Sequence, residues 1–327
     1  MSEVRLGAGR WALWRDVALR SAGFPAELVT RLGDAELAAA ADADPTGPEY
    51  DRAHRAGLER QSRVLEAIAR SPVFREAVAW QNPQLVLDCL DRLTADKPRN
   101  ARRRGHEMTV AGHVQRYALK NDTIGFFGPV GWATLLPTEP DLTVRPGAEL
   151  LARRTTYFEG WAVDKVARVL AELPEMYAWL KPTVVSTHLL RDGAVHRPRQ
   201  SPIPVSAGVY ALLQRCDGER TVRDLVDGSS GIVGGYPDEA AIRPVLERLR
   251  SKGVLRLDLE QPVQTWPEHA LRRRLLDVGD DAVRTRALAT LDEFIAARDV
   301  IAAASGDADK VLLGLSALDE MFLRVTG

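Results

Sequence analysis

Cysteine is scarce in this chain, which has only Cys89 and Cys216 among its 327 residues. Two thiols are too few for the disulfide framework of a small secreted protein, and this scarcity fits a reducing compartment. The opening residues MSEVRLGAGRWALWRD lack the apolar core of a signal peptide, and no apolar run reaches the roughly 18 residues of a transmembrane helix. We therefore expect a soluble cytoplasmic protein with no membrane partner.

Net charge is nearly absent too, because 44 basic residues face 45 acidic ones and the formal sum is -1. No global field therefore attracts nucleic acid, and any contact with a polyanion must come from a local basic patch. The composition, 45% hydrophobic and 27% charged, is that of a globular protein. The length indicates two or three packed units rather than one.

The usual signatures of chemistry are missing as well. The chain has no nucleophile elbow, no Walker A loop and no glycine-rich dinucleotide loop after a strand. Its six histidines are not spaced with the cysteines as metal ligands, so no metal site is predicted. Cys89 and Cys216 fall on the apolar sides of expected helices, which favours core thiols over nucleophiles. From the residues alone, no reaction can be assigned.

The pattern that is present predicts an α+β fold with a helix-rich N-terminal region. Residues 10–135 read as mostly helical, with a long amphipathic helix over 49–70. Two further helices are split at Asn82 and Pro83, since the residue before proline avoids helical geometry. Short strands and loops are expected over 134–160, followed by another helix. We take residues 1–180 as the first domain.

Residues 181–260 change character and predict a winged-helix module. Short strands turn at Asp192 and Gly193, and two short helices follow, the first capped by Ser206. A third helix begins at Asp238 and stops at Gly253, before a last strand. Strands, three helices and a strand within about 80 residues are typical of a winged helix. The remainder, 261–327, predicts a helical tail.

Such a module binds either DNA or a peptide. Its third helix is basic enough for DNA, with Arg243, Arg248, Arg250 and Lys252, but it also carries acidic residues. A peptide-binding module would offer a strand edge beside that helix. In SPIPVS the missing N–H groups of Pro202 and Pro204 fall on one side of the strand. That arrangement suits either of two roles. It protects the strand edge from unwanted pairing, which is the commoner case, or it allows another strand to add on one side only.

A basic cluster precedes the oddest stretch of the chain, RYALKNDTIGFFGPVGWA. The cluster consists of Lys97, Arg99, Arg102, Arg103 and Arg104. Charge runs of this kind are usually solvated surface, although they also attract the phosphates of nucleic acids. On composition alone, the solvated surface is the simpler interpretation.

Several segments resemble one known family. HLLRDGAVHRP, LLQRCDGERTVRDLV and VLERLRSKGVLRL resemble the leader-peptide recognition element of enzymes that mature ribosomal peptides. RYALKNDTIGFFG resembles the RYxxR…TPFG segment of lantibiotic dehydratases, within their glutamylation domain. WRDVALRSAGFPAELV is similar to the opening of that family, and LDEMFLRVTG to the segment before its arginine-rich active-site strand. The resemblance spans nearly the whole chain in the family's order.

The resemblance implies a function. Full-length members transfer glutamate from glutamyl-tRNA to Ser and Thr of a precursor peptide, and a second domain then eliminates it. Related members instead add an amino acid from aminoacyl-tRNA to a peptide C-terminus. The implied partners are a precursor peptide, aminoacyl-tRNA as co-substrate and an elimination-domain or other maturation-enzyme partner. No other cofactor and no DNA are implied.

The resemblance also implies site residues. Arg116 and Lys120 match the two basic positions of the family motif, and Thr123, with Asp122, is the candidate substitute for its later polar residues. The basic cluster from Lys97 to Arg104 becomes a candidate tRNA contact. Leader-peptide contacts are expected at Ile203, Val205, Ile242, Leu246 and Leu249. The family's later arginine and threonine fall on Ile124 and Phe126, which favours a non-catalytic module that presents the peptide. The front part of a larger enzyme and a split enzyme that needs a partner also stay open.

Overall fold

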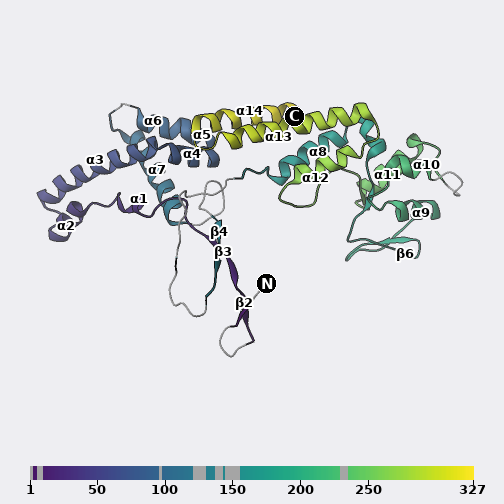
Figure 1. Cartoon of the computed structure of the whole chain (residues 1–327), viewed down its shortest axis with the longest axis horizontal. Helices are drawn as coiled ribbons and strands as arrows, with labels where there is room; N and C mark the ends of the chain where they lie inside the picture. The colour runs from purple at the N-terminus through teal and green to yellow at the C-terminus, as the bar shows by residue number, and fades with distance from the viewer. Residues whose placement is uncertain are drawn as a thin grey trace. The chain divides into compact units, whose positions relative to one another are not determined.

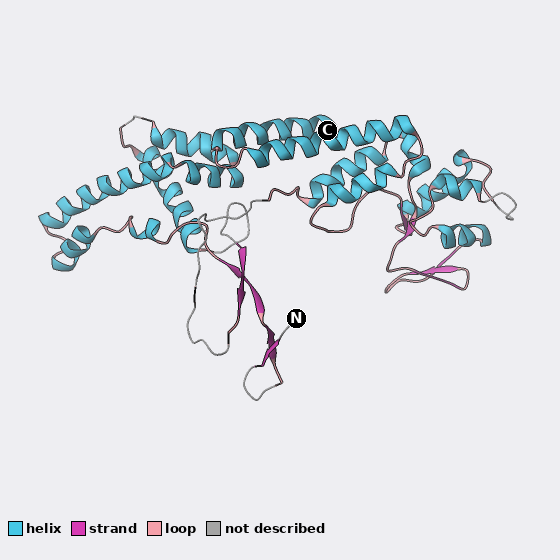
Figure 2. Cartoon of the chain, in the orientation of Figure 1, coloured by secondary structure: helices cyan, strands magenta, loops and turns pink. Residues whose placement is uncertain are grey.

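The computed structural model describes residues 3–5, 10–95, 98–120, 130–136, 143, 155–228 and 235–327. The chain divides into two compact units, each described here by itself. Unit 1 comprises Met1–Thr155 with Val300–Ser316, and unit 2 comprises Thr156–Asp299 with Ala317–Gly327. Helices dominate both units, and every sheet is small and antiparallel, so the predicted helix-rich α+β class is confirmed (Figures 1 and 2).

Unit 1 is built mainly from helices. They are α1 (Glu27–Thr30), α2 (Ala35–Ala43), α3 (Pro48–Arg70), α4 (Pro72–Gln81), α5 (Pro83–Leu85), the π-helical turn η1 (Val86–Leu90), α6 (Asp91–Thr94) and α7 (Ala101–Leu119). The predicted split before Pro83 is present, because Asn82 leaves helical geometry and its side chain caps the next turn. Asn100 caps α7 in the same way, by accepting from the Arg103 N–H.

The strands of unit 1 correct the expectation that residues 10–135 are mostly helical. They are β1 (Glu3–Arg5), β2 (Ala12–Trp14), β3 (Asp16–Arg20) and β4 (Val130–Thr134). β1 pairs with β2, and β3 pairs with β4 in the register Ala18 to Trp132. The second pairing joins segments more than a hundred residues apart, which local periodicity cannot reveal.

The core of unit 1 gathers large side chains from α4, η1, α6 and α7. Phe74, Leu90, Leu93 and Tyr117 are all fully buried. Cys89 lies among them with its thiol toward the His106 carbonyl, so the predicted core thiol is confirmed. These contacts fix α7, the helix that carries the predicted catalytic residues.

Unit 2 combines helices with two small sheets. Its elements are α8 (Gly160–Ala171), the 3₁₀ helix η2 (Pro174–Trp179), β5 (Thr183–Val184), β6 (Leu189–Arg191), β7 (Ala194–His196), β8 (Ile203–Pro204), α9 (Ala207–Arg215), α10 (Val222–Asp227), α11 (Glu239–Ser251), β9 (Leu255–Arg256) and α12 (Pro267–Leu276). The last two helices, α13 (Asp281–Ala303) and α14 (Ala308–Thr326), contribute residues to both units.

The local predictions for this region agree with the structure. Asp192 and Gly193 both have positive φ and form the turn between β6 and β7. Ser206 caps α9, Asp238 caps α11, and Gly253 ends α11 with positive φ. The sheet order is β6-β7-β8, while β5 pairs with β9. The predicted domain boundaries at residues 180 and 260 stay predictions, and residues 156–180 pack with unit 2.

A single hydrophobic core fills unit 2. Its buried members come from α8, η2, the sheets, α9 to α12 and the first part of α13. Met176, Leu213, Leu255 and Leu271 are among its largest fully buried side chains. None of the helices in the described part of the chain is long and apolar enough to span a membrane.

Candidate functional site

The C-terminal end of α7 carries the two basic residues of the predicted catalytic site. Arg116 is half-buried in the last turn, and Lys120 is the exposed residue that ends the helix. The Lys120 N–H donates to the Arg116 carbonyl at 3.2 Å, after which the backbone becomes extended. Two cations therefore lie at the carbonyl end of a helix, where the helix dipole stabilises positive charge.

Tyr117 anchors this end of α7. Its hydroxyl donates to Gln81 Oε1 at 2.7 Å, and its ring stacks on Phe24 with centroids 5.7 Å apart. The Phe24 N–H also donates to the Tyr117 carbonyl at 3.1 Å. Burial raises the Tyr117 pKa, so its hydroxyl stays protonated and acts as a donor. These contacts hold the backbone next to Arg116 in place.

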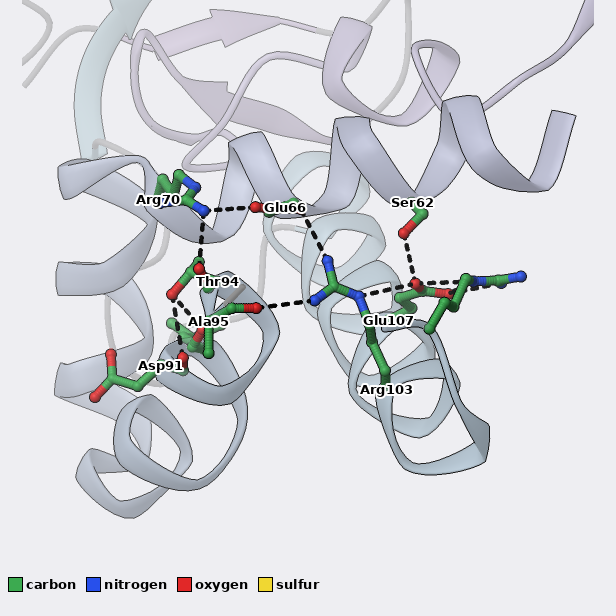
Figure 3. A network of polar contacts seen from close by, with 10 residues as sticks. Ser62, Glu66, Arg70, Asp91, Thr94, Ala95, Arg103 and Glu107 are labelled. Atoms are coloured by element: carbon green, nitrogen blue, oxygen red, sulfur yellow. Dashed lines mark hydrogen bonds and ion pairs between the residues drawn. The ribbon is translucent and has the colours of Figure 1, made fainter. Parts of the chain in front are cut away.

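The basic cluster divides into two kinds of residue. Arg99 makes a two-pronged ion pair with Glu107, the closest contact being 2.8 Å. Arg103 contacts Glu66 at 2.8 Å, as Figure 3 shows. Arg103 also donates to the Ala95 carbonyl at 3.2 Å. These two arginines thus link α7 and the segment before it to α3 and to the end of α6.

Glu107 is the centre of this network. It is buried on α7 and accepts from the Ser62 hydroxyl of α3 at 2.7 Å. Burial by itself would raise the pKa of Glu107, but hydrogen bonds from Arg99 and Ser62 outweigh burial and lower that pKa. Glu107 was not among the residues predicted from the sequence, although its four-residue spacing from Arg103 is a usual sign of a helical ion pair.

Arg102 and Arg104 are the exposed members of the cluster. Neither forms an ion pair with another described residue, so their guanidinium groups are available to an anion. Lys97 and Thr123 lie outside the described residues. Four of the five predicted tRNA contacts therefore lie on α7 or just before it. Arg102 and Arg104 are exposed, whereas Arg99 and Arg103 are held in ion pairs.

The predicted leader-binding residues lie together in unit 2, but they face inward. Ile242 and Leu246 are fully buried on α11, and Leu249 is nearly so. Ile203 and Val205 are half-buried and pack on the same core. A peptide at this surface would meet the backbone of β8 and the outer side chains of α11 rather than these five side chains.

The edge of β8 has a particular polarity. The Val205 N–H donates to the Gly193 carbonyl at 3.1 Å, and Ile203 is in register with Val195 of β7. Because successive residues of a strand point to opposite sides, the carbonyl of Pro204 faces outward. At Pro204 this edge offers an acceptor without the matching donor.

The CDGERTV turn ties α9, α10 and β5 together. Asp217 accepts from the N–H groups of Glu219 and Arg220, and Gly218 has a φ of +83°. A Cβ on Gly218 would stand 2.6 Å from Thr183 Oγ1. The Thr221 and Asp224 side chains then form a reciprocal cap on α10. The motif thus has a structural reason that is independent of any ligand.

A small apolar hollow of about 210 Å³ lies in unit 2 beside α8, α13 and α14. Its lining is mostly aromatic and aliphatic, including Tyr157, Trp161 and Phe294, and its two acidic members are Glu159 and Asp319. Among the described residues, no group of three or more His, Cys, Asp or Glu side chains could hold a metal ion. Buried charge is not confined to α7, because Glu268 and Arg298 form a buried ion pair in unit 2.

Comparison with known families decides the relationship. The family described as lantibiotic dehydratase, N terminus, matches residues 70–324, which is more than three quarters of the chain. The chain belongs to this family. The lantibiotic dehydratase match includes α7 with Arg116, the CDGERTV turn and most of α14. A search of curated proteins finds no match.

Solved structures agree on the fold. The glutamylation domain of TbtB from thiomuracin biosynthesis matches with a TM-score of 0.54 at 19% identity, over 92% of this chain and 37% of that one. The tRNA-dependent lantibiotic dehydratase MibB from Microbispora sp. 107891 matches with a TM-score of 0.56 at 15% identity, over 96% of this chain and 28% of that one. This chain therefore spans about a third of the length of the solved lantibiotic dehydratase chains.

Proposed function

We propose that this chain is the front part of a tRNA-dependent glutamylation domain. It would help to transfer glutamate from glutamyl-tRNA to Ser and Thr of a ribosomally made precursor peptide, toward dehydration in lanthipeptide or thiopeptide biosynthesis. The observation that carries the proposal is the lantibiotic dehydratase match over residues 70–324. The tRNA-dependent relative MibB, whose fold the chain shares, supports aminoacyl-tRNA as the co-substrate.

The chemistry suits what the chain offers. An aminoacyl ester is already activated, so the protein mainly has to orient two substrates and balance the charge of phosphate and carboxylate. In the proposal, Arg116 and Lys120 hold the glutamyl group or the tRNA end, and Thr123 supplies a hydroxyl beside them. Arg116 is the main candidate, because its half-buried position on a fixed helix end favours orientation.

The basic cluster is proposed to contact tRNA phosphate. Arg102 and Arg104 are exposed and would make the contacts, together with Lys97. Arg99 and Arg103 would instead hold α7 in place through Glu107 and Glu66, with access to phosphate only at their outer atoms. Replacement of the exposed pair should reduce both tRNA affinity and its salt dependence.

Residues 181–260 are proposed to form a winged-helix leader-peptide recognition element. The order β6-β7-β8 followed by α9, α10, α11 and β9 supports this assignment. An extended leader would run along β8 and donate an N–H group to the carbonyl of Pro204. Ile203, Val205, Ile242, Leu246 and Leu249 would form the packed floor below it.

The test is a mass measurement on the precursor peptide. The chain is incubated with precursor, glutamyl-tRNA and the maturation proteins encoded beside it, and the peptide is then weighed. The proposal predicts a gain of one or more glutamyl residues, absent with uncharged tRNA or without this chain. No gain, despite leader binding by this chain, would contradict the proposed transfer.

A non-catalytic leader-binding module is the second candidate. Ile124 and Phe126 stand where the family carries polar residues, which favours this alternative. It predicts that the chain binds leader peptide, yet precursor is modified equally well without the tRNA-binding arginines. Addition of an amino acid to the peptide C-terminus is a third candidate, and fragmentation of the modified peptide would locate that mass at its last residue.

DNA binding by the winged-helix module has the least support. Arg243 of α11 pairs with Glu239 and lies over the Tyr177 ring at 3.7 Å, while Arg250 pairs with Glu247. These contacts use two of the cations that a recognition helix would direct at DNA. Salt-dependent binding to duplex DNA without leader affinity would favour this function instead.

A further inference from the structure

The strands of unit 1 form a ribbon that is unusually apolar for an exposed surface. We call β1, β2, β3 and β4 with the adjoining residues 10, 11, 15, 135 and 136 the ribbon. In Figure 2 its strands run away from the helices of unit 1. Trp11, Trp14 and Trp132 are 78%, 63% and 80% exposed. Scattered apolar residues are normal on a surface, but three such tryptophans on one ribbon mark an interaction site.

The register places one apolar face of the ribbon toward solvent. Trp132 lies opposite Ala18, and Val130 lies opposite Arg20, so these four share a face. Trp132 and Val130 are both exposed on it. The other face is partly covered, because Val17 and its partner Ala133 are half-buried.

The backbone of the ribbon is also incomplete. Within the described chain, β1–β2 and β3–β4 are two-stranded sheets, so each strand has one edge without a strand neighbour. An isolated two-stranded ribbon is marginally stable in water and needs a third strand or a packed layer. Free edges of this kind are places where another polypeptide adds a strand.

The charges of the ribbon indicate what would cover it. The described part of the ribbon carries more positive than negative charge. Its basic residues are Arg5, Arg10, Arg15 and Arg20, and its acidic residues are Glu3 and Asp16. None of these arginines forms an ion pair with a described residue. A complementary strand would therefore carry apolar side chains toward Trp132 and carboxylates toward the arginines.

The ribbon also leads to the candidate site. Four residues after β3, the Phe24 N–H donates to the Tyr117 carbonyl, and Phe24 stacks on the Tyr117 ring. Tyr117 adjoins Arg116 in sequence. A polypeptide that adds to the base of the ribbon would thus come close to the end of α7, where it could contribute to the site.

We propose that the ribbon is the docking edge for the polypeptide that supplies the rest of the glutamylation domain. This inference rests on the proposed function. It also rests on coverage, because the chain spans only 28–37% of the solved chains that it matches. The occupant is an acidic, apolar-faced strand of that remaining part of the domain. It covers Trp132 and completes the surroundings of Arg116.

Hydrogen exchange tests the docking edge. The probe is the native protein in which this chain is joined to, or copurifies with, the remaining glutamylation domain from the same biosynthetic gene cluster. Amides of residues 12–20 and 130–134 should exchange at least about tenfold more slowly there than in the isolated chain. Dilution shows whether the protecting strand belongs to a separate chain, because only then does the protection weaken as the protein is diluted.

Variants make the test specific. Trp132→Glu and Val130→Glu should each abolish the protection, whereas Met108→Glu, at an exposed apolar position of α7, should not. An unchanged circular dichroism spectrum and an unchanged urea midpoint show that each variant is folded. Fast exchange in the assembled protein would overturn the inference, as would protection by tRNA alone or by a second copy of this chain.

Failure of this inference is distinguishable from failure of the proposed function. If glutamate transfer occurs while the ribbon stays unprotected, the ribbon assignment is wrong and the function stands. If the ribbon is protected but no aminoacyl-tRNA is used, docking holds without the proposed transfer.

Discussion

At the scale of single residues, buried polar groups around α7 explain how a dense basic cluster is held. Glu107 accepts from Arg99 and Ser62, and Glu66 accepts from Arg103. Loss of one partner from such a buried pair leaves uncompensated charge. The cluster therefore depends on acidic residues that are distant from it in sequence, such as Glu66.

Glu107→Gln should destabilise unit 1. The neutral amide loses the charge that balances Arg99 and Arg103, and we expect a loss of roughly 3 kcal/mol in the free energy of unfolding. Urea unfolding followed by circular dichroism measures it. Glu27→Gln, at an exposed position of α1, is the matched control and should change little. Equal stability of both variants would contradict a structural role for Glu107.

The same carboxylate should make stability depend on pH. The pKa of Glu107 is lowered in the folded protein, so its contribution is present above the unfolded pKa of about 4.3 and is lost as pH falls through the folded pKa. Urea midpoints of the wild type should therefore fall below about pH 4. Glu107→Gln should show a smaller fall over the same range, and parallel curves would refute this assignment.

The two cysteines should be unreactive in the native protein. Burial raises the pKa of the Cys216 thiol to about 12 and that of Cys89 to about 11, so almost no thiolate is present near pH 8. Iodoacetamide labelling followed by mass spectrometry should be slow in buffer and fast in urea. Rapid native labelling at either position would show that its environment is more open.

At the scale of elements, the edge of β8 decides how a leader peptide could add. The missing N–H of Pro204 leaves this edge with an acceptor and no donor at that position. The edge is thereby protected from pairing with a second copy, while a peptide can still donate to it.

Pro204→Ala should therefore increase strand addition at β8. The variant regains an outward N–H, and we expect leader affinity to rise about fivefold, as one hydrogen bond contributes roughly 1 kcal/mol. Fluorescence titration with labelled leader peptide measures this. Pro198→Ala, at an exposed turn position outside the strand, should leave affinity unchanged. Equal affinity of all three proteins would place the leader elsewhere.

Elements with local signals were predictable from the sequence, and those with distant partners were not. The Asp192–Gly193 turn, the caps at Ser206 and Asp238 and the break at Asn82 depend on neighbouring residues alone. Strand β3 depends on β4, which no local pattern shows. Likewise, Arg116 could be proposed from its motif, whereas the burial of Ile242 required the packed core.

At the scale of the whole molecule, the chain is a lantibiotic dehydratase family member that spans about a third of its solved relatives' length. The proposed docking edge and the proposed catalytic residues at the end of α7 both rest on that relation. The proposal assigns tRNA and the glutamyl group to α7 of unit 1, and the leader peptide to β8 of unit 2.

The most direct test of the central claim is the transfer of labelled glutamate from glutamyl-tRNA to precursor peptide by the native assembly. We expect glutamate transfer with the wild type and a rate at least about 100-fold lower with Arg116→Ala. With Arg104→Ala we expect only a salt-sensitive decrease in the transfer rate. Circular dichroism and leader affinity confirm that both variants are folded. Transfer that is unchanged in Arg116→Ala, or that proceeds without charged tRNA, would contradict the account.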